Sequence, residues 1–188
     1  MENIENPADG AGSEHSLVII DADSIIYIIG SSLQDLQLEP MGIIKLDEFL
    51  QDILINTGAK KYLGYFGGKG ARCFRYDVAV TKPYKGTRKK EKEQWFDFWA
   101  PVLTAHMETV WGFTPVTKIE ADDACTIAAT ALKGKYDKIT IASPDKDLRQ
   151  CGGFTFFDYG KRFTEFIDEV EGSRKLMYQL VTGRMLPV

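Results

Sequence analysis

Residues 17–24 read LVIIDADS, and this stretch decides the expected fold. A continuous apolar run that ends in a turn is typical of a strand buried on both faces of a parallel sheet. Another buried strand is expected at residues 138–142, KITIA, and it ends at the turn SPDKD at residues 143–147. We therefore expect two central strands that both lead into acidic residues.

Strand and helix patterns alternate along the rest of the chain. Apolar residues recur at helical spacing from Leu46 to Leu54, and Gly58 closes that helix. Further strands are expected at residues 61–66, 116–119, 154–157 and 162–167, and further helices at 95–102, 124–132 and 175–182. Pro101 argues against an unbroken helix in its region. The alternation predicts an α/β fold with a mostly parallel central sheet flanked by helices.

The composition is that of an ordinary globular protein. The 188 residues are 44% hydrophobic, and 23 basic residues face 27 acidic ones for a net charge of −4. One domain is expected, since a chain of this length can bury its own core. The sequence has no run of about 18 apolar residues that would suggest a membrane span, and its three cysteines imply neither a disulfide framework nor a zinc knuckle. Residues 1–16 are polar and acidic, which predicts a flexible leader and a cytoplasmic protein.

Acidic residues follow three of the expected strands. Because parallel strands end at the same edge of a sheet, these groups would converge there. Packed carboxylates repel each other, and oxygen ligands favour the hard cations Mg²⁺ or Mn²⁺ over zinc. Two such ions roughly 4 Å apart suit the hydrolysis of a phosphodiester. The carboxylates concerned are Asp21, Asp23, Glu120, Asp122, Asp123, Asp145 and Asp147.

A purely structural interpretation of the same residues stays open. An Asp after a strand is often a helix N-cap, and the helix dipole favours Asp122 and Asp123 in a first turn. Asp145 and Asp147 flank Lys146 and could form a solvated turn. The metal interpretation is favoured because all three clusters occupy the same kind of place.

A basic stretch, KPYKGTRKKEK at residues 82–92, holds six basic residues and one acid. Its tyrosine offers a ring on which a base can stack, and two of its cations lie one helical turn apart, within reach of phosphates. A solvated helix face is the alternative. The side chains expected to contact nucleic acid are Lys82, Tyr84, Lys85, Arg88, Lys89, Lys90, Arg72 and Arg75. A basic segment beside an acidic sheet edge is the layout of a nuclease.

Other motifs fit less well. The glycine-rich turn at residues 67–70 lacks the spacing of a nucleotide-binding P-loop. His15 and His106 belong to no hydrolase signature, and the cysteines are expected to be small buried hydrophobes.

In order, the motifs LVIIDAD, YKGTRKK, IEADDACTIAA, SPDKDLRQ and LVTG resemble those of the 5′→3′ exonuclease and flap endonuclease family, across residues 17–183. The likeness is to the bacteriophage type and to the nuclease domain of bacterial DNA polymerase I. It implies a PIN-like α/β domain, a basic helical arch through which single-stranded 5′ ends pass, and hydrolysis by two Mg²⁺ ions. It also implies a phage-encoded protein of DNA replication in the host cytoplasm.

The resemblance assigns roles to single residues. The implied metal ligands are Asp21, Glu120, Asp122, Asp123, Asp145 and Asp147. The implied catalytic residues are Lys85, Arg88 and Asp145. Lys85 would offset charge on the scissile phosphate, and Tyr84 and Arg88 match the same basic helix.

The sequence departs from the family pattern at two places. The family has an Asp in the turn after its second strand, where this chain has Gly67. In the family a Gly-Asp-x-x-Asp-Asn motif and a helix–hairpin–helix module follow the last helix, whereas residues 184–188 read RMLPV. We therefore expect a short tail without the second-site aspartates and without the module that grips duplex DNA.

Together, these observations predict a Mg²⁺- or Mn²⁺-dependent nuclease that acts as a monomer on DNA with a single-stranded 5′ end or flap. No membrane partner is expected. Two alternatives stay open. One is a nucleic-acid-binding remnant with impaired catalysis, and the other is a PIN-type endoribonuclease that acts on RNA.

Overall fold

The computed structural model describes residues 4–5, 15–68, 70, 72–81, 84 and 94–182. The strands are β1 (Ile4–Glu5), β2 (Ser16–Asp21), β3 (Lys61–Gly67), β4 (Thr114–Val116), β5 (Lys138–Ala142), β6 (Phe154–Asp158) and β7 (Phe163–Ile167). The helices are α1 (Asp23–Ser32), α2 (Glu39–Thr57), α3 (Arg75–Val78), α4 (Gln94–Thr109), α5 (Ala121–Leu132), the short 3-10 helix η1 (Asp147–Gln150) and α6 (Glu169–Thr182).

The described strands form one mixed sheet. Its order is β1-β3-β2-β5-β6-β7, and β4 pairs with β3. Neighbouring strands run parallel from β3 through β2 and β5 to β6, and β4 also runs parallel to β3. Strands β1 and β7 run antiparallel to their neighbours. In the register Asp21 lies beside Tyr65, and Ile20 beside Ala142. The carboxyl ends of β2, β3 and β5 therefore meet at one edge.

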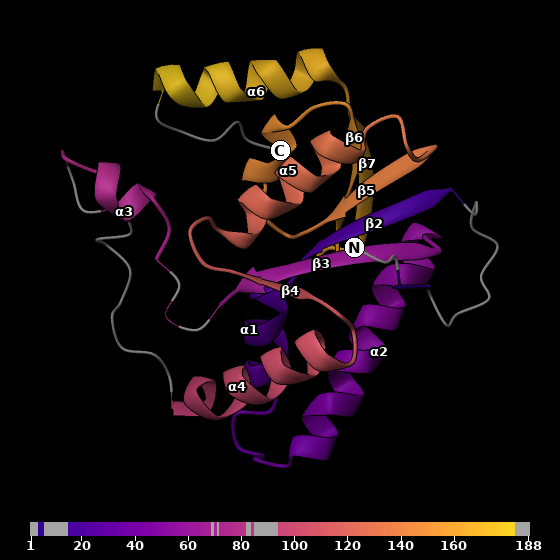
Figure 1. Cartoon of the computed structure of the whole chain (residues 1–188), viewed down its shortest axis with the longest axis vertical. Helices are drawn as coiled ribbons and strands as arrows, with labels where there is room; N and C mark the ends of the chain where they lie inside the picture. The colour runs from indigo at the N-terminus through magenta and orange to yellow at the C-terminus, as the bar shows by residue number, and fades with distance from the viewer. Residues whose placement is uncertain are drawn as a thin grey trace.

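Helices cover both faces of the sheet (Figure 1). Alternate residues of β2 point to opposite sides: Val18 and Ile20 join the core beneath α1, α2 and α4, while Leu17 and Ile19 join the core beneath α5. All four of these side chains are at most 1% exposed. The apolar run in β2 is thus explained by burial on both faces.

Helix α4 continues through Pro101 as a single helix. The proline removes one backbone hydrogen bond, but Trp99 and Leu103 on the same helix are fully buried against α1 and α2. A Cβ atom at Gly42 would lie 2.1 Å from the Trp99 ring, so this glycine allows α2 and α4 to pack closely. Burial of its apolar face therefore stabilises α4 as one helix despite the proline.

The expected fold class is confirmed, with shifts at several boundaries. The expected strand at residues 116–119 is instead β4 at 114–116, because its pairing with β3 ends at Val116. Within the expected leader, Ile4–Glu5 pairs with β3 and Ser16 already belongs to β2. The last helix begins at Glu169, six residues before the expected start at Lys175.

The expected basic arch falls on residues 82–92, of which the structure describes only Tyr84. Among the described residues, no helix is both long enough and apolar enough to cross a bilayer. Helix α3 lies between β3 and α4 in the chain and stands apart from the two helical layers (Figure 1).

Candidate active site at the carboxyl edge of the sheet

Asp21, the last residue of β2, is the most buried of the expected metal ligands, with 5% of its surface exposed. The Ser143 hydroxyl donates a hydrogen bond of 2.9 Å to Asp21 Oδ2, and the backbone N–H of Asp23 donates one of 3.3 Å to Oδ1. Burial raises the pKa of this carboxyl from 3.8 to about 7, and the nearby charge of Asp23 acts in the same direction. The folded protein therefore pays a free-energy cost to hold Asp21 ionised.

Ser143 links two of the acidic clusters. It follows β5, and its hydroxyl oxygen accepts a hydrogen bond of 3.0 Å from the backbone N–H of Asp145. The Tyr159 hydroxyl donates a bond of 2.7 Å to the carbonyl oxygen of Asp21. The end of β2 is thus bonded through hydroxyl groups both to the loop after β5 and to the residue that follows β6.

Asp23 connects α1 to the end of β3. Its Oδ1 atom accepts a hydrogen bond of 2.7 Å from the backbone N–H of Gly67. A Cβ atom at Gly67 would lie 3.4 Å from the same carboxylate oxygen. The space beside Gly67, where the family pattern has an Asp, is therefore bordered by the carboxylate of Asp23.

The second cluster forms the start of α5. Glu120 is the N-cap, and its backbone N–H donates a hydrogen bond of 3.2 Å to Asp123 Oδ2 in a capping box. The backbone N–H of Asp123 donates a bond of 2.7 Å to Asp122 Oδ1. Burial is the main cause that raises the pKa of Asp122. These acids therefore have the helix-capping role that the sequence left open, whatever else they bind.

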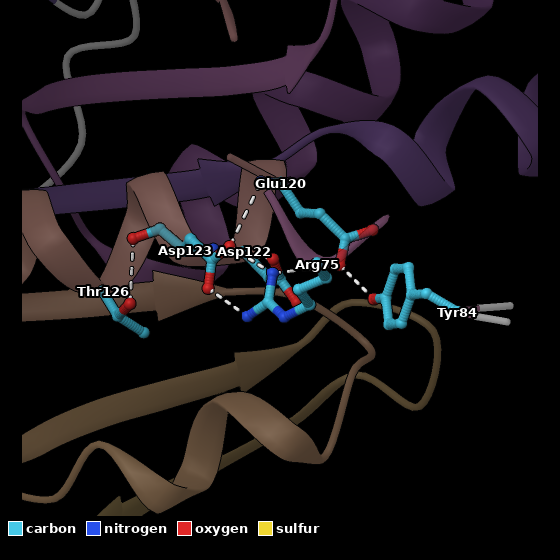
Figure 2. A network of polar contacts seen from close by, with 6 residues as sticks. All are labelled: Arg75, Tyr84, Glu120, Asp122, Asp123 and Thr126. Atoms are coloured by element: carbon cyan, nitrogen blue, oxygen red, sulfur yellow. Dashed lines mark hydrogen bonds and ion pairs between the residues drawn. The ribbon is translucent and has the colours of Figure 1, made fainter. Parts of the chain in front are cut away.

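Arg75 and Tyr84 contact this cluster from the segment between β3 and α4 (Figure 2). The Arg75 guanidinium donates two parallel hydrogen bonds to Asp123, of 2.5 and 2.6 Å, and a third of 3.2 Å to Glu120. The Tyr84 hydroxyl donates a short hydrogen bond to Glu120. The bonds to Asp123 raise the pKa of Arg75, and burial together with the bond to Glu120 raises that of Tyr84.

The third cluster lies in the loop after β5. Asp145 Oδ1 accepts a hydrogen bond of 2.9 Å from the backbone N–H of Asp147, which closes a local turn. Partial desolvation raises the pKa of Asp147, and the neighbouring charge of Asp145 adds to the shift. Arg149, only 4% exposed, pairs with Glu165 of β7 and donates a hydrogen bond of 3.5 Å to the carbonyl oxygen of Asp145. The buried guanidinium thus ties the loop to the sheet.

A groove of about 970 Å³ brings the second and third clusters to one surface. Its walls come from α5, η1 and α6, and from the segment that carries Arg75 and Tyr84. The acidic residues that line it are Glu120, Asp122, Asp123 and Asp147. Apolar side chains such as Ile127 and Leu180 form the rest of its surface.

The expected ligands reach this edge but do not form a ready-made cation cage. Among the residues that the structure describes, no group of three or more His, Cys, Asp or Glu side chains is close enough to hold a metal ion. Asp123 and Glu120 instead accept hydrogen bonds from Arg75, and Asp21 accepts one from Ser143.

The expected nucleic-acid contacts are described only in part. Arg72 forms an exposed ion pair of 2.9 Å with Asp77, and Arg75 and Tyr84 contact carboxylates. The remaining expected contacts lie outside the described residues: Lys82, Lys85, Arg88, Lys89 and Lys90.

Sequence reasoning missed three residues that organise the site. Ser143 directly follows a buried strand, at the same kind of position as the acids, and that placement could have indicated it. Arg149 and Tyr159 carried no such signal, because their partners are distant in sequence.

The mixed sheet with helices on both faces is similar in fold to solved structures of 5′-nucleases, and this likeness confirms the sequence resemblance at the level of the fold. The chain is similar to the 5′-exonuclease of bacteriophage T5 in a structure with bound zinc ions, with a TM-score of 0.60, 17% identity, and coverage of 80% of this chain and 58% of that one. It is also similar to the T5 flap endonuclease in a complex with DNA and metal ions, with a TM-score of 0.61, 16% identity, and coverage of 80% and 57%.

The chain thus spans less than three fifths of the length of these two structures. No family model matches the sequence, and no curated protein matches it.

Proposed function

We propose that the protein is a Mg²⁺- or Mn²⁺-dependent 5′-nuclease that hydrolyses phosphodiester bonds in DNA with a single-stranded 5′ end or flap. One observation carries the proposal: carboxylates from three distant segments come to the carboxyl edge of one sheet, and two of the three clusters line a common groove. The likeness in fold to a phage 5′-exonuclease supports it.

The chemistry of the site fits a hard divalent cation. The potential donors are all oxygens, which favours Mg²⁺ or Mn²⁺. The guanidinium of Arg75 already stands as a cation between Asp123 and Glu120. Burial raises the pKa of Asp21, and a bound cation would act in the opposite direction by favouring the ionised carboxylate. The residues that would hold metal are Asp21, Glu120, Asp122, Asp123, Asp145 and Asp147.

A bound divalent ion would activate a water molecule and neutralise charge on the phosphate. The residues of the chain do the positioning. Ser143 orients Asp21 and the Asp145 loop by hydrogen bonds, and Arg149 holds that loop against the sheet. We assign phosphate contacts to Lys85 and Arg88, which lie outside the described residues, with Asp145 as the third catalytic residue.

The test is cleavage of a labelled 5′-flap DNA in Mg²⁺ and in Mn²⁺. We expect products from the wild-type chain, and at least a hundredfold less from the double variant Asp145→Asn, Asp147→Asn. Asp52→Asn is the control, because Asp52 pairs with Arg162 on the surface and its substitution removes a carboxylate charge outside the acidic clusters. Circular dichroism establishes that each variant folds. No cleavage in either metal, or equal cleavage by wild type and double variant, would overturn the proposal.

A second candidate is a nucleic-acid-binding protein without turnover. Gly67 favours it, because a metal-ligating side chain is missing where the family pattern has one. This candidate predicts salt-sensitive DNA binding with no cleavage. A parallel reaction with a single-stranded RNA of the same sequence tests the endoribonuclease alternative, which predicts that RNA is the substrate that is cut.

A further inference from the structure

Arg75 occupies the position of a counter-ion at the second acidic cluster. Its two terminal nitrogens each contact a different oxygen of Asp123, so both carboxylate oxygens are engaged. Paired bonds of this kind between Arg and a carboxylate are among the stronger polar contacts in proteins. The side chains of Arg75 and Asp123 are 31% and 23% exposed, which reduces screening by solvent compared with a surface pair.

These contacts join α3 to the start of α5. The backbone N–H of Phe74 donates a hydrogen bond of 3.0 Å to the carbonyl oxygen of Lys118, just before α5. The Tyr84 hydroxyl reaches Glu120, and its ring packs edge-on against Tyr76 of α3, with centroids 5.2 Å apart. Arg75 and Tyr84 therefore connect α3 to the acidic cluster (Figure 2).

A divalent cation and Arg75 compete for the same oxygens. The guanidinium already accounts for one accepted hydrogen bond on each oxygen of Asp123. A metal ion on the remaining lone pairs would place a second cation on the same carboxylate, and two cations so close repel each other. Metal binding at Asp123 therefore weakens the pair with Arg75 and favours movement of the guanidinium away from it.

We propose that Arg75 and Tyr84 form a latch that closes the acidic cluster in the metal-free protein and opens when a divalent cation binds. This inference rests on the proposed function, because it assumes that Glu120 and Asp123 receive metal. Once released, the guanidinium of Arg75 remains at the groove, where the phosphate backbone of a nucleic acid is a suitable partner. Metal binding and nucleic-acid binding then strengthen each other, because both favour the open state.

The first experiment measures Mn²⁺ affinity by electron paramagnetic resonance for the wild type, Arg75→Gln, Arg75→Lys and the control Lys133→Gln. We expect Arg75→Gln to bind Mn²⁺ at least about fivefold more tightly than the wild type, the lower end of typical coupling. Arg75→Lys keeps the charge but loses the paired bonds, so it should also bind more tightly. Lys133→Gln removes an exposed charge that pairs with Glu169 beyond the last residue of α5, and its affinity should match the wild type.

The second experiment follows hydrogen exchange of the backbone amides of residues 74–79 in the wild type, with and without Mg²⁺. These amides make the hydrogen bonds of α3 and its contact with Lys118. An open latch predicts faster exchange in Mg²⁺. Slower or unchanged exchange in Mg²⁺ would overturn the inference.

The outcomes separate the latch from the function on which it rests. Equal Mn²⁺ affinity of wild type, Arg75→Lys and Arg75→Gln would overturn the latch and leave the proposed metal site standing. Weaker binding by both Arg75 variants would also overturn it, since Arg75 would then support the metal. Absence of Mn²⁺ binding in every protein would overturn the proposed function and the latch together.

Discussion

The substitution Asp21→Asn tests how the buried acidic edge responds to pH. In the metal-free protein the pKa of Asp21 is raised from 3.8 to about 7, mainly by burial. A group whose pKa is higher in the folded than in the unfolded protein adds to the free energy of unfolding. This contribution is full at pH values below the pKa of the unfolded state, and it is lost as the pH rises through the pKa of the folded state. The wild-type chain should therefore lose stability from this group between pH 4 and pH 7. The Asn side chain has no such loss, because it does not ionise.

The size of the effect follows from the pKa values. Between pH 5 and pH 7 the carboxyl is ionised in the unfolded chain and protonated in the folded one, and each pH unit in that window changes the free energy of unfolding by 1.36 kcal/mol. The contribution lost between pH 5 and pH 8 is then about 3 kcal/mol. At 5% exposure Asp21 needs little discount for screening by solvent.

The assay is urea unfolding in EDTA at pH 5, 6, 7 and 8 for wild type and Asp21→Asn. The measured quantity is the difference in free energy of unfolding between the two proteins, because other titrating groups cancel in it. Between pH 5 and pH 8 we expect the free energy of unfolding of the wild type to fall by about 3 kcal/mol relative to that of Asp21→Asn. A difference that stays constant from pH 5 to pH 8 would refute the argument from burial.

Three further substitutions test the supports of the site and the core. Ser143→Ala removes the 2.9 Å hydrogen bond to Asp21 and should cost about 1–3 kcal/mol of unfolding free energy, with the greater loss at pH 8, where the carboxylate is ionised. Arg149→Met leaves the carboxylates of Asp158 and Glu165 without their buried cation, and urea unfolding should show a loss of about 3–5 kcal/mol in the free energy of unfolding. Gly42→Ala places a Cβ atom 2.1 Å from the Trp99 ring and should lower the melting temperature, with a cost of about 1–3 kcal/mol; an unchanged melting temperature would contradict the close packing of α2 and α4.

The strands that position the site could be predicted because their signals are local. The run at residues 17–20 is apolar throughout and residues 139–142 are all buried, since each strand is covered on both faces. The acids that follow them lie at one sheet edge because the strands run parallel. That part of the site follows from the pattern alone.

Other elements depend on partners that lie far away in the sequence. Helix α1 at Asp23–Ser32 has apolar residues on several sides, so it gave no clear helical stripe. Strand β4 contains Pro115, and its limits are set by pairing with β3 rather than by its own composition. A proline is tolerated there because β4 pairs with β3 alone among the described strands.

The partner of Arg75 was the least predictable feature of the site. The planar guanidinium matches the geometry of a phosphate and of a carboxylate. The sequence indicated phosphate because other basic residues follow Arg75 in the chain. Asp123 lies 48 positions further along the chain, and only the fold brings the two together. The contact forms because the fold places the start of α5 beside α3.

The most direct test of the central claim, that the acidic edge of the sheet is a divalent-metal site, is the anomalous scattering of Mn²⁺ in crystals of the protein. The account predicts an anomalous peak within coordination distance of the carboxylates of the first two clusters, Asp21 and Asp122 among them, with the guanidinium of Arg75 moved away from Asp123. A crystal saturated with Mn²⁺ that shows no peak at this edge, with Arg75 still bound to Asp123, would contradict it.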